Sequence, residues 1–174
     1  MEWKIKITVK GRERMINNKN RDILGYSSSC FCFDNPGPEN TQKTVRDAFQ
    51  GLPPLKAGES DPSIPNHKAP SHSPRILEII RKIPKDGGTI RDLPKHYWLR
   101  CHLNHNGHKD VYGRLWWDRP APTLTTGCLS ASKGRYIHPE QDRTISAREA
   151  ARLQGFPDDF IFYGTLTRIA KQIG

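Results

Sequence analysis

The stretch RTISAREAARLQGFPDDF, residues 143–160, carries the strongest local structural signal in the chain. Ser146 and Glu149 have the Ser-x-x-Glu spacing of a capping box, in which each side chain bonds the other residue's backbone amide at a helix start. Gly155 stands where a C-cap glycine belongs, and Pro157 prevents the helix from continuing. The sequence therefore predicts a short helix that begins after Ser146 and ends near Gly155.

A second helix is predicted upstream, where Ser73 supplies a cap residue and Pro74 a first-turn proline. It extends to about Lys82 and ends at Pro84. The apolar stripe of this helix consists of Ile76, Ile79, Ile80 and Ile83.

A shorter helix is predicted over residues 44–49, capped by Thr41 or Thr44 and ended by the Gly-Leu-Pro that follows. The prolines of residues 51–74 predict an extended loop. Residues 85–110 are irregular, polar and rich in His and Lys.

Strand signals are weaker than helix signals. Apolar residues alternate over residues 3–9 (WKIKITV), which favours an edge strand. The basic stretch that follows, residues 10–22, has no assigned element. Residues 111–128 are expected to form one or two strands, broken at residues 119–122, where the chain reads RPAP.

Composition indicates a loop-rich fold with a modest core. The 174 residues include 14 Pro and 14 Gly, and 34% of the residues are hydrophobic. They are enough for one domain, or for one lobe of a larger one. The net charge of +10 favours a polyanionic partner, most commonly nucleic acid, although a basic protein without such a partner is the alternative.

The start of the chain, MEWKIKITVK, lacks the apolar segment of a signal peptide, and no apolar run approaches membrane-spanning length. We therefore expect a cytoplasmic, nucleoid-associated protein without a membrane partner. The four cysteines are expected to be reduced.

Several blocks in order resemble the DNA (cytosine-5) methyltransferase family of bacterial restriction-modification systems. TVRDA and GLP in residues 44–53 resemble the start of its variable target-recognition region. RPAPTLTT, residues 119–126, resembles its ninth motif. Residues 143–160 resemble the helix before the tenth motif, and KQIG, residues 171–174, resembles the start of that motif. The resemblance covers about residues 30–174.

The resemblance implies an α+β fold with a loop-rich small lobe of short twisted strands. Its C-terminal helices would pack on a missing Rossmann-like catalytic lobe, and without that lobe their face would be partly exposed. The expected divisions are an N-terminal segment of unassigned role (1–42), a target-recognition region (43–142) and a truncated C-terminal helical segment (143–174). In this family a Cys thiolate adds to C6 of a flipped cytosine and a Glu supports protonation at N3. S-adenosylmethionine then supplies the methyl group to C5.

The family's catalytic motifs are not present in these 174 residues. Its nucleophile follows a proline, whereas the four cysteines here follow Ser, Phe, Arg and Gly. A Phe-x-Gly-x-Gly cofactor loop is also missing. We therefore expect no activity from the chain alone, which leaves three hypotheses. It is a fragment, a subunit of a split methyltransferase completed by a second chain with the catalytic lobe, or a stand-alone sequence-specific DNA-binding module.

Candidate contacts for double-stranded DNA come mainly from residues 97–118 (YWLRCHLNHNGHKDVYGRLWWD), where the family places its sequence-reading loops. Arg and Lys suit phosphate or guanine, and Asn suits adenine. The candidates are Arg100, His102, Asn104, His105, Asn106, His108, Lys109 and Arg114, with Arg119, Thr125 and Thr126 from the ninth-motif block. Gln172 and Gly174 are the candidate contacts to S-adenosylmethionine.

Structural alternatives accompany these assignments. The three tryptophans of residues 97–118 are expected in the core, and residues 119–126 could equally form a structural turn. Cys101 and the three nearby histidines invite a zinc interpretation, but their spacing is not that of a standard finger, so no metal is expected. Arg148 and Arg152 share a helix face that would turn to solvent or to phosphate.

Overall fold

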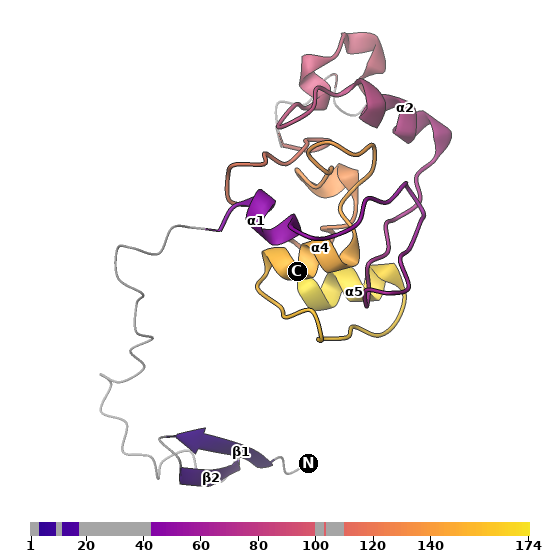
Figure 1. Cartoon of the computed structure of the whole chain (residues 1–174). Helices are drawn as coiled ribbons and strands as arrows, with labels where there is room; N and C mark the ends of the chain where they lie inside the picture. The colour runs from indigo at the N-terminus through magenta and orange to yellow at the C-terminus, as the bar shows by residue number, and fades with distance from the viewer. Residues whose placement is uncertain (1–3, 10–11, 18–42, 100–102, 104–109) are drawn as a thin grey trace, which may run out of the picture. The chain divides into compact units, whose positions relative to one another are not determined.

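The computed structural model describes residues 4–9, 12–17, 43–99, 103 and 110–174. The chain divides into two compact units, residues 1–41 and residues 42–174. The α-helices labelled in Figure 1 all belong to the second unit. Within the described residues, no helix has the length and apolar character needed to cross a membrane.

The first unit contains an antiparallel pair of strands, β1 (Lys4–Val9) and β2 (Arg12–Asn17). The register pairs the first residue of β1, Lys4, with the last residue of β2, Asn17. The strand expected over residues 3–9 is confirmed. Its partner, β2, lies in the basic stretch to which no element was assigned. No strand was predicted there because the two apolar residues of β2 are adjacent and do not alternate with polar ones.

The second unit contains the three predicted helices and a fourth at its C-terminal end. Among the described residues, the α-helices are α1 (Val45–Phe49), α2 (Pro74–Lys82), α4 (Ala147–Leu153) and α5 (Leu166–Ile173). The 3-10 helices are η1 (Ile90–Asp92), η2 (Lys95–Tyr97) and η3 (Ala131–Lys133).

Two of the three predicted helix starts, those of α1 and α4, have the expected side-chain cap. Ser146 and Glu149 form the expected capping box at the start of α4. Thr44, one of the two expected caps of α1, forms a second box with Asp47. Ser73 makes no side-chain capping bond, so α2 begins on the fixed backbone angle of its first-turn proline.

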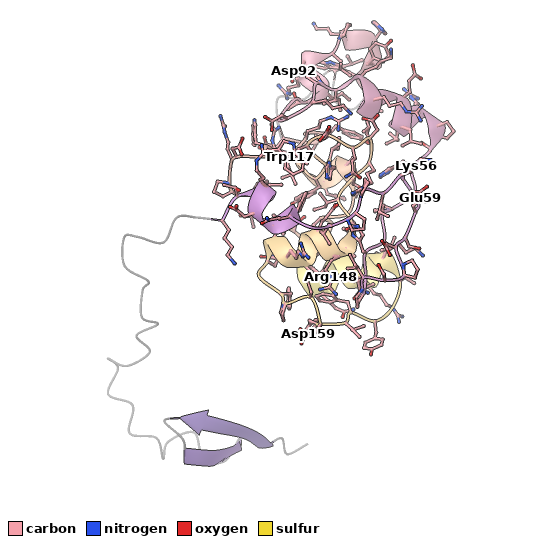
Figure 2. The ribbon with its side chains drawn as sticks, viewed as in Figure 1. Lys56, Glu59, Asp92, Trp117, Arg148 and Asp159 are labelled. Carbon is pink, nitrogen blue, oxygen red and sulfur yellow. The ribbon has the colours of Figure 1, made fainter. Side chains whose placement is uncertain are left out.

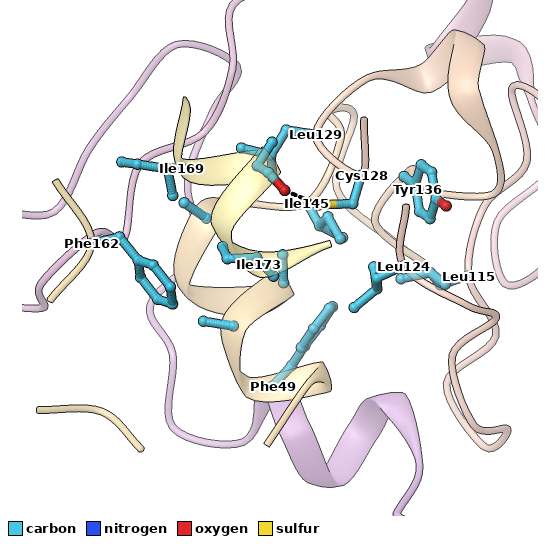
Figure 3. Packing of buried hydrophobic residues seen from close by; sticks show 14 of the residues in the cluster. Phe49, Leu115, Leu124, Cys128, Leu129, Tyr136, Ile145, Phe162, Ile169 and Ile173 are labelled. Carbon is cyan, nitrogen blue, oxygen red and sulfur yellow. Dashed lines mark hydrogen bonds between the residues drawn. The ribbon is translucent and has the colours of Figure 1, made fainter. Parts of the chain in front are cut away.

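The larger core cluster surrounds α4 and α5 (Figure 3). Ala150 and Ala151 of α4, Ile169 and Ile173 of α5, and Phe49 of α1 are all buried in it. The apolar face of the C-terminal helices, which was expected to be partly exposed, is therefore covered within this unit. Large apolar side chains are instead exposed in the loop after α4, at Phe160, Ile161 and Tyr163.

A second core cluster lies under α2. Ile79, Ile80 and Ile83 are buried there, and Ile76 packs partly against them, which confirms the predicted stripe. Ile90 of η1 and Ala131 of η3 belong to the same cluster, so these two 3-10 helices share the core that lies under α2.

The prediction of strands in residues 111–128 is wrong. In the described part of the chain this segment makes only an isolated bridge, between Arg114 and Ile137. Tyr112 has a left-handed backbone with φ of +53°, which turns the chain before a ladder can form. Pro120 and Pro122 then lack the amide hydrogens that a ladder needs.

Candidate nucleic-acid interface

Most of the predicted DNA contacts lie outside the described residues. These are Arg100, His102, Asn104, His105, Asn106, His108 and Lys109, and Cys101 of the zinc alternative lies there too. Among the residues that are described, no three His, Cys, Asp or Glu side chains gather where a metal ion could bind. The structure places the other four predicted contacts, Arg114, Arg119, Thr125 and Thr126.

Arg114 was expected to contact DNA, but its side chain is fully buried. Its guanidinium donates to the carbonyl oxygens of Ile80 at 2.7 Å and Ile83 at 3.2 Å, at the end of α2. It also donates to two loop carbonyls and pairs with Asp142 at 2.7 Å. Burial lowers the pKa of Arg114, and the bond to Asp142 opposes this shift. Because its donors are used inside the protein, Arg114 stabilises the fold and presents nothing to DNA in this structure.

Arg119 is exposed and lies over an aromatic ring. Its guanidinium carbon is 4.8 Å from the ring centroid of half-buried Trp116, and that of Arg135 is 3.9 Å from the same centroid. Arg135 is itself buried and donates to the carbonyl of Gly87 at 2.7 Å. The buried arginine thus fixes the indole, and the indole restricts the exposed Arg119 without neutralising its charge.

Arg46 of α1 makes a similar cation–π contact with the next tryptophan, Trp117. Its guanidinium lies 5.2 Å from the ring of Trp117, which Figure 2 shows beside α1, and donates to both carboxylate oxygens of Asp118 at 2.7 and 3.1 Å. The hydrogen bond from Arg46 lowers the pKa of Asp118. The backbone amide of Val45 also donates to the carbonyl of Arg119 at 3.0 Å. The start of α1 and residues 117–119 therefore form one surface.

Thr125 and Thr126 continue this surface and are both exposed. The hydroxyl of buried Tyr136 accepts from the Thr125 amide at 3.1 Å and donates to the Thr123 carbonyl at 2.9 Å, which fixes the backbone here. A groove of about 370 Å³ runs alongside, between residues 120–124 and the end of α4, with Lys43 at its wall. The arrangement offers one cation and two hydroxyl groups along a rigid turn, a donor set suited to phosphate oxygens.

The family model for C-5 cytosine-specific DNA methylase matches residues 10–174. The chain belongs to this family. The type II methylase M.HgiDII of Herpetosiphon aurantiacus is 41% identical over 144 residues, which cover 79% of this chain and 40% of the relative. The type II methyltransferase M.Eco47II of Escherichia coli is 36% identical over 169 residues, covering 94% of this chain and 38% of the relative.

A plant relative has a much longer chain. DNA (cytosine-5)-methyltransferase 3 of Arabidopsis thaliana is 36% identical over 157 residues, which cover 75% of this chain and 11% of the relative. The methylase chain described here therefore spans about 40% or less of the length of these relatives.

The two candidate contacts to S-adenosylmethionine, the methyl donor of this methylase family, have local roles in the structure. The Gln172 amide donates to the carbonyl of Tyr163 at 3.0 Å and to that of Arg168 at 3.3 Å. A side chain at Gly174 would overlap the backbone of Thr125, so close packing explains the glycine. Both residues are therefore engaged within the fold, through the Gln172 amide nitrogen and through the close packing of Gly174.

The arginines expected on a solvent or phosphate face of α4 are placed differently. Arg148 of α4 is fully buried (Figure 2). It donates to the carbonyl oxygens of Pro65, Pro157 and Phe160. Arg152 donates to the carbonyls of Ala48 and Gln50 and pairs with Asp158 at 2.7 Å. These two arginines therefore hold loops together.

Three residues that build this surface were not predicted from the sequence: Arg46, Trp116 and, beneath the indole, buried Arg135. Trp116 could have been found, since two adjacent tryptophans shortly before an exposed arginine offer it a ring to stack on. Arg135 gave no such signal, because it lies 19 residues from the ring that it contacts.

Proposed function

We propose that residues 42–174 contact duplex DNA as the recognition part of a DNA (cytosine-5) methyltransferase of restriction-modification type. Family membership and the type II relatives support this proposal. The observation that carries it is the exposed guanidinium of Arg119, held 4.8 Å from the Trp116 ring. Two further exposed residues with hydroxyl groups, Thr125 and Thr126, follow in the same segment.

The stacked arginine suits a phosphate contact for a physical reason. A planar guanidinium donates two parallel hydrogen bonds to phosphate, and stacking on Trp116 reduces the side-chain entropy that binding would otherwise cost. Thr125 and Thr126 would donate hydroxyl groups to neighbouring phosphates. Such contacts orient the protein on the duplex, whereas base contacts give sequence specificity. The seven candidates within residues 100–109 remain predicted DNA contacts, to phosphates or to bases.

The methyl transfer itself would depend on residues outside these 174, either elsewhere in the same polypeptide or in a second chain. Tritiated S-adenosylmethionine and bacterial duplex DNA test this, first with the chain alone and then with a separately expressed N-terminal methyltransferase half. We expect no label in DNA from the chain alone. Label in that first reaction would contradict the assignment, because it would require a nucleophile that lacks the family's Pro-Cys context.

DNA contact by Arg119 is tested by fluorescence anisotropy of labelled duplexes at several salt concentrations. The Arg119→Ala variant should reduce the slope of log affinity against log salt by about 0.9, the effect of one phosphate contact. Arg168→Ala, which removes an exposed arginine from α5, is the matched control and should leave the slope unchanged. Equal slopes for both variants would exclude Arg119 as a phosphate contact, and no binding by the unmodified chain would contradict the proposed function.

A further inference from the structure

A second basic surface lies on the outer side of α2 and on the 3-10 helices η1 and η2. The inner side of α2 is committed to the core through Ile79, Ile80 and Ile83. Its outer side carries exposed Arg81 and Lys82. Residues 74–99, which include these elements, hold six Lys or Arg residues and three Asp or Glu residues. We name this outer surface the α2–η2 face.

Aromatic rings hold cations on the α2–η2 face. The ammonium nitrogen of Lys82 lies 5.0 Å from the ring centroid of Tyr97, and the ring of His96 is 4.1 Å from the same tyrosine. The Trp98 indole donates to the Leu93 carbonyl at 2.8 Å, which fixes the segment that follows η2. A cation over a ring is oriented but keeps its charge, so this arrangement keeps positive charge available at the surface.

Three cations of this face, at positions 81, 82 and 95, have no carboxylate partner among the described residues. In the described part of the chain, Arg81, Lys82 and Lys95 form no ion pair, whereas Lys85, just beyond α2, is paired with Asp142. Two of the three nearby carboxylates are already engaged with backbone amides. Asp86 accepts a hydrogen bond from the Trp117 amide. Asp92, which is labelled in Figure 2, accepts one from the Thr89 amide. The remaining carboxylate, Glu78, is exposed on α2.

We propose that the α2–η2 face binds the sugar–phosphate backbone of duplex DNA, with Lys82 and Lys95 as its phosphate contacts. This inference rests on the proposed function and adds a second contact surface, built on α2 and the core cluster under it. Lysine is a point charge on a flexible stem, which suits phosphate oxygens better than the edges of bases. The face therefore anchors the protein on DNA of any sequence.

Duplex binding by the 174-residue chain tests the proposal, again by anisotropy across a range of salt concentrations. The test variant combines Lys82→Gln with Lys95→Gln. The control combines Lys68→Gln with Lys171→Gln, two exposed lysines on other elements, and so removes the same net charge. The thermal unfolding midpoint of each variant is measured in parallel, because the substituted side chains are exposed and should leave folding unchanged.

Two phosphate contacts predict a decrease of about 1.8 in the slope of log affinity against log salt for the test variant, with the control unchanged. The decrease should be the same on two duplexes of unrelated sequence. Equal slopes for the test and control variants would overturn the inference and leave the Arg119 result standing. Absence of binding by the unmodified chain would overturn the proposed function, and this inference with it.

Discussion

Replacing Arg143 with Met should destabilise residues 42–174 severely. The side chains of Arg143 and Glu149 are 0% and 2% exposed, and the closest distance between their charged atoms is 2.6 Å. The same guanidinium donates to the carbonyl of Leu55 at 3.1 Å and to that of Thr144 at 3.0 Å. Methionine fills similar space without any donor, so Glu149 is left buried without its counter-ion.

The expected loss of folding stability follows from the uncompensated charge of Glu149. Removing one partner of a buried ion pair costs about 3–5 kcal/mol, against a total free energy of unfolding of about 5–15 kcal/mol for a typical domain. The unfolding temperature should fall on the order of 10 °C. Burial alone would raise the pKa of Glu149, but the hydrogen bond and charge of Arg143 lower it below its ordinary value. The pair therefore stabilises the fold at neutral pH, and this contribution is lost as pH falls through the lowered pKa.

Urea unfolding followed by tryptophan fluorescence measures the loss. A double-mutant cycle with Glu149→Gln separates the pair from its surroundings, with an expected coupling of about 0.5–3 kcal/mol. Arg46→Met is the control, because Arg46 and Asp118 form an exposed pair with side chains 58% and 74% exposed, and it should change stability little. The reasoning fails if Arg143→Met unfolds at the same urea concentration as Arg46→Met, or if the two losses in the cycle simply add.

Two further substitutions test local packing and charge. Gly87→Ala should destabilise more than Gly51→Ala, because both glycines have positive φ but only at Gly87 would the new methyl overlap the Trp116 indole. That overlap costs about 1–3 kcal/mol beyond the backbone strain, and equal urea midpoints would refute it. Burial lowers the pKa of His138 to about 3, so the unfolded chain alone takes up this proton below about pH 6.5. Stability should fall from there toward pH 3, and less steeply in His138→Gln.

The helices were predictable because their signals are local. The capping box of Ser146 with Glu149, the first-turn Pro74 and the stripe of isoleucines each act within a few residues, and neighbouring contacts realise them. The strands of residues 111–128 failed for the opposite reason. Their apolar residues pack against distant parts of the chain, as Leu115 does in the core of α4 and α5, so burial occurs without pairing. Sequence spacing carries no information about such partners.

The candidate interface was harder to predict because arginine has two uses in this fold. Arg119 and Arg114 are five residues apart and both suit phosphate, yet one is exposed on a ring and the other is fully buried. The buried Arg114 side chain is held by hydrogen bonds to carbonyls some thirty residues earlier in the chain, at the end of α2. Residue type and spacing could therefore identify a basic region but could not separate a DNA contact from a structural donor.

The buried arginines perform a task that sheets perform in other folds. A helix leaves its last carbonyls without partners, and this loop-rich chain has few ladders to satisfy others. Buried Arg114 bonds the last carbonyls of α2, and half-buried Arg152 does the same at the end of α1. Five donors in a fixed plane allow one arginine to join several carbonyls, which lysine cannot do.

This use of arginine changes what the net charge of +10 means for function. Among the residues whose burial the structure describes, four arginines are no more than 6% exposed, at positions 114, 135, 143 and 148, so their charges lie away from any phosphate. Affinity for DNA should then depend on individual exposed cations such as Arg119, Lys82 and Lys95. Removing an equal charge from another surface should matter far less, which is why each binding test here is paired with a control of matched charge.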